Sequence, residues 1–127
     1  MIAVLLALAM SQDPPLNCTD PQYQAEMNQC AARDFERADA ELNRLWREVI
    51  ATARSSDREI DRQSDQQPLS EQVLRNAQRA WVTFRDAHCE YESFEARGGS
   101  MQTMIYEGCR AKLTQERISQ LRPDQTE

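Results

Sequence analysis

The chain has little glycine and almost no histidine: it contains three glycines and one histidine among 127 residues. With so few glycines it has no glycine-rich loop of the kind that binds phosphate groups. A single histidine excludes a histidine cluster that could hold a metal, and no serine-centred nucleophile motif occurs. The sequence therefore offers no catalytic constellation, and we expect a protein that is not an enzyme and has no cofactor.

Basic residues are in the minority, with 15 Lys and Arg against 21 Asp and Glu, a net charge of −6. This charge disfavours nucleic acid as a partner, because phosphates require a basic surface. It would speed the encounter with a basic protein, although it also serves ordinary solubility. Long hydrophobic runs are lacking too, since Met1–Met10 is shorter than the about 20 residues that cross a bilayer. We expect a protein partner and no transmembrane segment in the mature chain.

Residues 1–11 resemble the apolar core of a secretory signal peptide. Ala7 and Ala9 provide a cleavage site of small residues, although the usual basic residues before the apolar core are missing. A buried N-terminal strand is the alternative, and the Pro-Pro pair that follows disfavours it. Cys18 lacks the small preceding residues of a lipidation site. We therefore expect an exported, periplasmic protein, with secretion or attachment to the envelope as alternatives.

The remaining sequence predicts α-helices, because Ala, Leu, Glu, Gln and Arg dominate and no strand pattern or internal repeat occurs. The first helix is expected to begin at Asp20, as its cap, and to run to about Ala53. Its apolar side chains recur every three or four residues, as in an amphipathic helix: Met27, Ala31, Phe35, Ala38, Leu42, Leu45 and Val49.

A polar loop and two further helices follow. Only Ile60 is apolar between residues 54 and 67, so residues 54–68 predict a polar loop. The second helix is expected to begin with Ser70 as its cap and to end near Arg97, and the third to begin at Ser100 and to end before Pro123. The core-facing stripe expected for the second helix comprises Val73, Ala77, Ala80, Trp81, Phe84, Ala87 and Tyr91. Residues 18–122 are expected to form a single helical domain.

The second and third helices meet at Gly98-Gly99, and each carries one cysteine. Cys89 lies ten residues before Gly99, and Cys109 lies ten residues after it. In an antiparallel hairpin this symmetry places the two cysteines at the same height. Their Cα atoms can then approach to the about 4.4–6.8 Å that a disulfide requires. We therefore expect a Cys89–Cys109 disulfide.

Cys18 and Cys30 then pair or remain free. Cys30 falls in the third turn of the first helix, and the segment around Cys18 could fold back on that helix. Four cysteines allow three connectivities, and sequence alone does not prove one. An even number of cysteines suits an exported protein, because disulfides persist in oxidising compartments. The preferred fold class is all-α, a three-helix antiparallel hairpin bundle stapled by disulfides 18–30 and 89–109.

Four polar residues are expected to fix the register of the helices. Asp39 and Asn43 interrupt the first helix close to its apolar stripe. Folding the chain back in the middle of the polar loop places Asp39 opposite Arg85. Folding it back at the glycine pair places Arg117 opposite Trp81. We expect an Asp39–Arg85 ion pair and an Arg117 side chain stacked on Trp81.

One pair of residues has the spacing of metal ligands. His88 and Glu92 lie one helical turn apart and could offer two ligands on one helical face. Zinc requires four ligands, or three and a water, and nothing else in the sequence completes the set. We therefore expect no metal site, and a partly exposed structural histidine is the simpler interpretation.

Several short runs of residues, at fixed spacings from the four cysteines, form a recognisable pattern. They are Glu26–Ala31 and Asp39–Asn43, Gln78–Trp81 and Phe84–Cys89, and then Gly98–Ser100, Cys109, Leu113-Thr114 and Glu116-Arg117. Together they resemble the LprI-like lysozyme inhibitor family, over about Cys18 to Arg122. The resemblance implies a small exported helical protein of the bacterial periplasm or envelope. The chain departs from the family's lipoprotein form, because it has no lipidation cysteine.

The resemblance implies a protein-binding inhibitor of lysozyme that protects peptidoglycan. The alternative is a periplasmic structural or adaptor protein of the envelope with a different partner. An acidic inhibitor would be steered onto a basic lysozyme, and a protruding loop could enter the concave cleft. The turn of Arg97, Gly98, Gly99 and Ser100 is our candidate, because a disulfide behind it lowers the cost of ordering on binding. The acidic loop at residues 55–67 is the second candidate, and both segments could be plain connectors.

Overall fold

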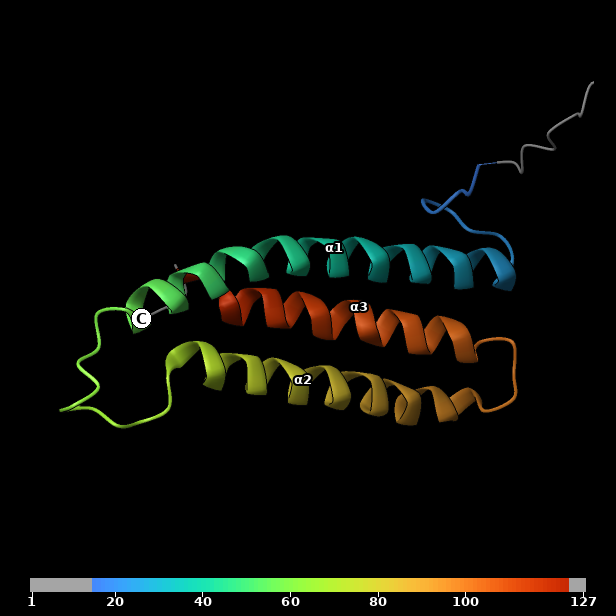
Figure 1. Ribbon diagram of the computed structural model, residues 1–127. Coiled ribbons are helices and arrows are strands. Elements are labelled where there is room, and N and C mark those ends of the chain that lie inside the picture. The colour runs from blue at the N-terminus through green and yellow to red at the C-terminus, as the bar shows by residue number, and fades with distance from the viewer. Residues whose placement is uncertain (1–14, 124–127) are drawn as a thin grey trace, which may run out of the picture.

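The structure, a computed structural model, describes residues 15–123, which form three long helices and one short 3-10 helix. The elements are α1 (Gln24–Asp57), α2 (Ser70–Ser93), η1 (Phe94–Ala96) and α3 (Gln102–Leu121). Consecutive helices run antiparallel, and the α2–α3 turn lies at the opposite end of the bundle from the α1–α2 loop (Figure 1). The described residues contain no strand, so the expected all-α fold is confirmed. The signal-like residues 1–11 lie outside the described part.

The start of α1 differs from the prediction. Asp20, expected as the cap, lies before the helix. The Cys18–Cys30 disulfide holds the preceding segment against the helix, with the two Cα atoms 5.5 Å apart. Within this folded-back segment, the Glu26 carboxylate accepts a hydrogen bond of 3.2 Å from the backbone N–H of Gln22. Because this segment doubles back, helical geometry begins only beyond it.

The junction between α1 and α2 corrects two further expectations. α1 continues to Asp57, so the polar loop begins later than residue 54. The Asp57 carboxylate accepts hydrogen bonds from the backbone N–H groups of Ser70 (2.8 Å) and Glu71 (2.9 Å). Asp57 therefore satisfies the first N–H groups of α2, the role predicted for the Ser70 side chain. Glu71 in turn accepts from Arg54 at 2.6 Å and from Arg75 at 3.1 Å, which ties the two helix ends together.

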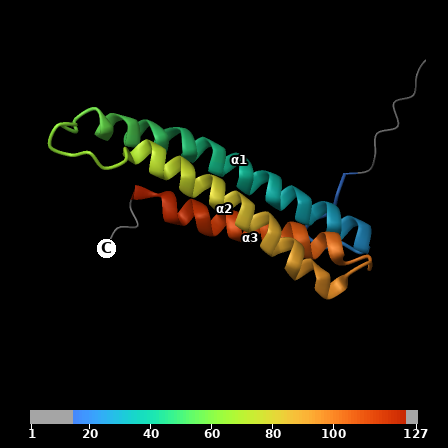
Figure 2. The same cartoon turned by 60° about the horizontal axis from the view of Figure 1, so that its bottom comes forward.

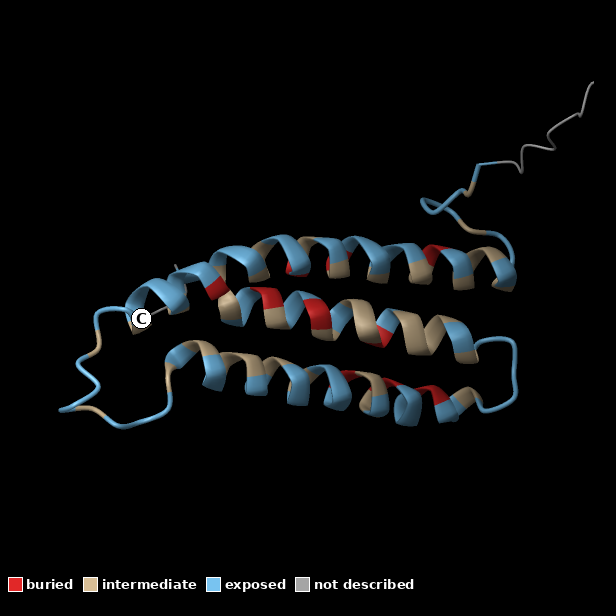
Figure 3. Cartoon of the chain, in the orientation of Figure 1, coloured by how far each residue is buried: buried red, intermediate tan, exposed pale blue. Residues whose placement is uncertain are grey.

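The predicted core stripe of α2 is wrong. Of its seven residues only Trp81 is partly buried, and the other six are exposed: Val73, Ala77, Ala80, Phe84, Ala87 and Tyr91. The residues of α2 that are buried are Arg85, Cys89 and Ser93 (Figure 3). The two polar residues can be buried because they have hydrogen-bond partners. Arg85 donates to the hydroxyl of Thr114 on α3, and Ser93 donates to the carbonyl of Glu90. Apolar periodicity therefore identified the outer face of this helix.

The core lies where the three helices meet, and it is small. Its apolar members, each less than a tenth exposed, are Cys30, Ala38, Leu42, Ile50, Cys89, Cys109 and Ile118. The stripe predicted for α1 is confirmed at Ala38 and Leu42, which are 1% and 3% exposed. The Cys89–Cys109 disulfide joins α2 to α3 inside this core, with a Cα–Cα distance of 5.4 Å. Both predicted disulfides are therefore present.

The two disulfides should respond differently to reductant. Cys89 is fully buried, whereas Cys18 is exposed. Thiol–disulfide exchange requires access to a sulfur atom, so a mild thiol should open Cys18–Cys30 first. Alkylation followed by peptide mass mapping measures the order. Alkylation of Cys89 before Cys18 in the folded protein would contradict this prediction.

The buried bridge should also stabilise the fold. Its loss in Cys89→Ala/Cys109→Ala should lower the free energy of unfolding by about 3 kcal/mol.

Acid should weaken the α1–α2 junction. Hydrogen bonds from Arg54 and then Arg75 lower the pKa of Glu71 from 4.5 to about 2, and the backbone N–H of Glu71 lowers the pKa of Asp57. Because both pKa values are lower in the folded chain, their contribution is present above about pH 4.5 and is lost as the pH falls towards 2. Denaturant unfolding of wild type and Glu71→Gln across this range measures it.

The stability of Glu71→Gln should be lower than that of wild type at neutral pH, and the two should converge near pH 2. The side chains of Asp57 and Glu71 are partly exposed, so added salt should reduce the stability difference between the two proteins at neutral pH. Parallel pH profiles for the two proteins would show that this junction contributes no pH dependence. Glu59→Gln, an exposed carboxylate in the neighbouring loop, is the matched control.

Candidate functional site

The candidate site is the exposed turn between η1 and α3, at one end of the bundle (Figure 2). Gly98 has φ of 76°, a left-handed conformation that residues with a side chain rarely adopt. Gly99 donates a hydrogen bond of 2.8 Å to the carbonyl of Ala96. A Cβ atom added at Gly99 would lie 3.1 Å from that same carbonyl oxygen. The glycine pair therefore sets both the direction and the tightness of the turn.

Neighbouring helices hold the turn in place. The Gln102 side chain accepts a hydrogen bond of 3.0 Å from the backbone N–H of Gly98. The Asn28 side chain, on α1, donates one of 3.1 Å to the carbonyl of Ser100. Ser100 lies before α3 and does not cap it, contrary to expectation, because α3 begins at Gln102. The turn is therefore tied to α3 through Gln102 and to α1 through Asn28.

The surroundings of the turn are acidic. Three exposed carboxylates, Glu90, Glu92 and Glu95, come shortly before the turn, which itself carries Arg97. The Arg97 guanidinium lies over the ring of Phe94, 4.4 Å from its centroid. Phe94 and Met101, on either side of the turn, are 37% and 46% exposed. The end of the bundle therefore combines a rigid turn, exposed apolar side chains and negative charge, which suits a basic protein surface.

The second candidate, the α1–α2 loop, lies at the opposite end of the bundle (Figure 1). Its acidic side chains satisfy the backbone of the loop itself. Asp61 accepts a hydrogen bond of 3.0 Å from the N–H of Gln63, and Asp65 accepts one of 2.9 Å from the N–H of Gln67. Carboxylates that are used in this way fix the shape of the loop, which favours a connecting role.

The predicted polar network has Arg85 at its centre. Arg85 is 6% exposed, and its guanidinium lies 5.0 Å from the ring centroids of both Phe35 and Trp81. Its Nη1 atom is 3.8 Å from Asp39 Oδ1, the partner expected from the fold-back geometry. Its Nε atom donates a shorter bond, 2.9 Å, to the adjacent Asp86. Two carboxylates and two rings thus surround one buried charge, which offsets the loss of its hydration.

A second arginine joins this network, and the sequence did not reveal it. The Arg110 guanidinium lies 3.7 Å from the Phe35 centroid and 4.6 Å from that of Tyr106. It also lies 2.8 Å from Glu107 and 3.9 Å from Asp86. Phe35 therefore contacts two guanidinium groups. The signal that could have indicated Arg110 is its position directly after Cys109, which places it at the edge of the buried face of α3.

Two members of the predicted network lie at its margin. Arg117 is 5.8 Å from the Trp81 centroid, and its Nε atom donates a hydrogen bond of 2.9 Å to Gln78 on α2. Burial lowers the pKa of Arg117 below its usual value. Asn43 is exposed and stays outside the contacts that the arginines make. We propose that Asp39, Arg85 and Arg117 fix the register of the three helices.

Comparison with known proteins assigns the chain to a family. Residues 17–121 match the family described as lysozyme inhibitor LprI. The chain belongs to the LprI family. An uncharacterized protein of Rhizobium meliloti (strain 1021) is 40% identical over 116 residues, which cover 91% of this chain and 84% of the relative. No solved structure gives a significant match.

Membership of the LprI family gives context to two other features. A family of inhibitors implies a protein partner, and both the family and the two disulfides indicate export to an oxidising compartment. Within residues 15–123 the helices are too polar for any of them to span a bilayer.

One group of residues in this LprI-family chain has the proximity of metal ligands: His88, Glu92 and Cys109. The Sγ atom of Cys109 is bonded to Cys89, so it cannot act as the thiolate ligand that zinc requires. His88 is 3.2 Å from Glu92 and stacks on Phe84. These contacts account for the histidine without a metal.

Alanine substitutions at two glycines should change stability in opposite directions. Gly98→Ala forces an alanine into a left-handed conformation, so the free energy of unfolding should fall by about 1 kcal/mol. Gly108 lies within α3 with open space around it, so Gly108→Ala should raise it by about 0.5–1 kcal/mol. Urea unfolding of both variants measures the two values. Equal shifts in the two variants would show that the turn is not conformationally constrained.

Proposed function

We propose that this LprI-family protein inhibits lysozyme by placing the Arg97–Ser100 turn against the catalytic cleft of the enzyme. The family match over residues 17–121 carries the proposal. We further propose that the protein acts in the periplasm, where it would protect peptidoglycan. The relative from Rhizobium meliloti has no described activity, so the proposal rests on the family and on the geometry of the turn.

The geometry of the turn supports this mode of binding. A lysozyme cleft holds a sugar polymer and is concave, so its blocker must protrude and stay narrow. Gly98 and Gly99 have no side chains, and the four residues of the turn are exposed at the end of the bundle. The hydrogen bonds from Asn28 and to Gln102 fix the backbone before binding. A preformed turn loses little conformational entropy on binding.

The charge around the turn supports a basic lysozyme as the target. The exposed carboxylates Glu90, Glu92 and Glu95 come shortly before the turn, and the whole chain carries a net charge of −6. Opposite charges on two proteins accelerate their encounter and orient it, and salt screens this attraction. Inhibition should therefore be strongest at low ionic strength.

The proposal is tested by titrating the oxidised protein into a lysis assay of purified peptidoglycan with an animal-type lysozyme. We expect saturable inhibition that weakens with salt. Ser100→Trp adds a bulky side chain at the exposed turn and should raise the half-inhibitory concentration at least about tenfold, because it obstructs entry into the cleft. Gln66→Trp, at an exposed position of the α1–α2 loop, is the control and should change it less than about twofold.

A second pair of variants separates charge from shape. Glu92→Gln/Glu95→Gln removes two exposed carboxylates beside the turn, and Glu36→Gln/Glu59→Gln removes two exposed ones elsewhere. At low salt the first double variant should weaken inhibition about three- to tenfold more than the second. At high salt the two double variants should inhibit equally well.

Two results would contradict the proposal. No inhibition of animal-type, goose-type or phage lysozymes at high molar excess would favour a structural or adaptor role in the envelope. In that case pull-down from envelope extracts should retain another protein. Equal effects of Ser100→Trp and Gln66→Trp would leave lysozyme as the target but exclude the turn as the contact.

A further inference from the structure

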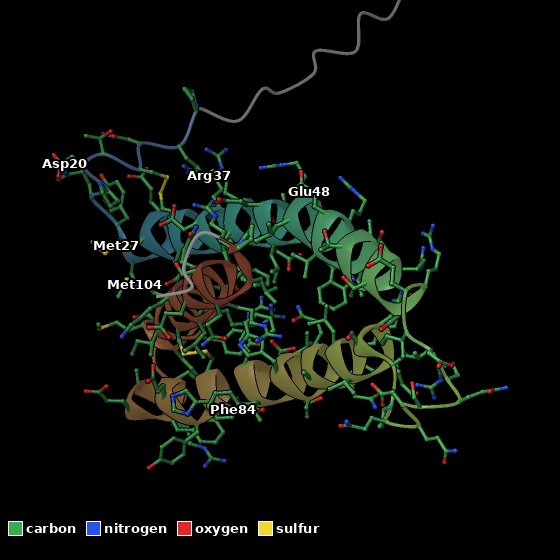
Figure 4. All side chains as sticks on the ribbon, turned by 90° about the vertical axis from the view of Figure 1, so that its left-hand side faces the viewer. Asp20, Met27, Arg37, Glu48, Phe84 and Met104 are labelled. Atoms are coloured by element: carbon green, nitrogen blue, oxygen red, sulfur yellow. A yellow bond between two sulfur atoms is a disulfide. The ribbon has the colours of Figure 1, made fainter. Side chains whose placement is uncertain are left out.

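The outer face of α2 carries an apolar stripe that its own bundle does not use. Six residues form this outer stripe: Val73, Ala77, Ala80, Phe84, Ala87 and Tyr91. Val73 is 52% exposed, Phe84 56% and Tyr91 74%. Phe84 lies on the side of α2 that is turned away from α1 and α3 (Figure 4). The exposed face of a helix is normally polar, so this stripe is a candidate contact surface.

The spacing of the outer stripe is that of a helix–helix seam. Its members follow one another at intervals of four, three, four, three and four residues. This is the heptad pattern, in which apolar residues repeat every 3.5 residues on average and pack against a second helix. The opposite face of α2, with Arg85, Cys89 and Ser93, already packs inside the bundle. A second helix is therefore the kind of partner that this spacing fits.

The positions of the stripe residues are symmetric about residue 82. When two copies of α2 run antiparallel with a two-fold axis at that position, Ala80 lies opposite the partner's Phe84. Ala77 then lies opposite the partner's Ala87. Each Phe84 ring thus meets a small Ala80 next to the axis, and the two alanines at 77 and 87 leave room for close approach. Val73 lies opposite the partner's Tyr91. A two-fold interface needs one surface that is complementary to itself, and this stripe has that property.

The flanking positions are also compatible with this antiparallel register. Asn76 lies opposite the partner's Glu90, where an amide can donate to a carboxylate. Leu74 lies opposite the partner's His88, and the two copies of Thr83 meet at the axis. No pair of like charges is opposed among these flanking positions.

We propose that the outer stripe binds a second copy of this chain, forming an antiparallel α2–α2 dimer. The stripe from Val73 to Tyr91 extends over about 27 Å of helix. One helix from each copy buries less area than the about 1,600 Å² of a standard interface, so the dimer is in reversible equilibrium with the monomer. The two Arg97–Ser100 turns then lie at opposite ends of the dimer and stay uncovered.

Ionic strength distinguishes this dimer from lysozyme binding. Two chains that each carry a net charge of −6 repel at long range, and salt screens that repulsion. Dimerisation should therefore strengthen with salt, whereas inhibition of a basic lysozyme should weaken. The dimer does not depend on the proposed function.

Sedimentation equilibrium of the full chain, from about 5 to 500 µM at about 0.05 and 0.5 M salt, tests the proposal. We expect a monomer–dimer equilibrium that shifts towards dimer at the higher salt. Phe84→Glu places a charge against the apolar seam and should raise the dissociation constant at least about tenfold. Tyr23→Glu alters another exposed aromatic residue, 73% exposed and directly before α1, and should change the dissociation constant less than about twofold.

Cross-linking tests the antiparallel register. In an antiparallel pair Thr83→Cys lies beside its own copy and should form a disulfide-linked dimer on mild oxidation, whereas Glu90→Cys lies away from its copy. The four native cysteines are already paired and serve as the background. A monomer at every concentration, an unchanged dimer in Phe84→Glu, or preferential cross-linking at Glu90→Cys would overturn the proposal.

Discussion

The Cys89–Cys109 disulfide is the constraint on which the rest of this structure depends. It fixes the height of α2 against α3 inside a core of few apolar side chains. On one side it keeps the ends of both helices close enough for a four-residue turn. On the other side it aligns Arg85 with Thr114, 3.4 Å away on α3. In a chain with so small a core, such a bond supplies a large part of the stability of the fold.

The polar network explains why α2 presents its apolar side chains to solvent. The guanidinium groups of Arg85 and Arg110 lie between the helices, and both contact the ring of Phe35. Carboxylates from α1, α2 and α3 compensate their charge, and the aromatic rings replace part of their hydration. Because these groups use the space between the helices, α2 faces inward with its polar side. Its apolar residues are left on the outer surface.

The two ends of the bundle are stabilised by different means, and this separates their roles. At one end Asp57 and Glu71 use hydrogen bonds and ion pairs to close the α1–α2 loop. At the other end two glycines and a buried disulfide hold a narrow turn beside exposed carboxylates. The family match supports a protein partner, for which we propose the turn as the contact, and we propose a second copy of the chain as the partner of the outer stripe.

The sequence by itself predicted the three helices, the Cys89–Cys109 disulfide, the glycine turn and the Asp39–Arg85 proximity, and it favoured the Cys18–Cys30 disulfide without proving it. These follow from periodicity and from distances along the chain, which helical geometry converts into heights. Only the tertiary structure decided which face of α2 is buried and that Arg110 joins the centre of the bundle. It also decided that Asp57 rather than Ser70 satisfies the start of α2. Those features depend on partners from other helices, and a buried arginine is stabilised only when such partners are in place.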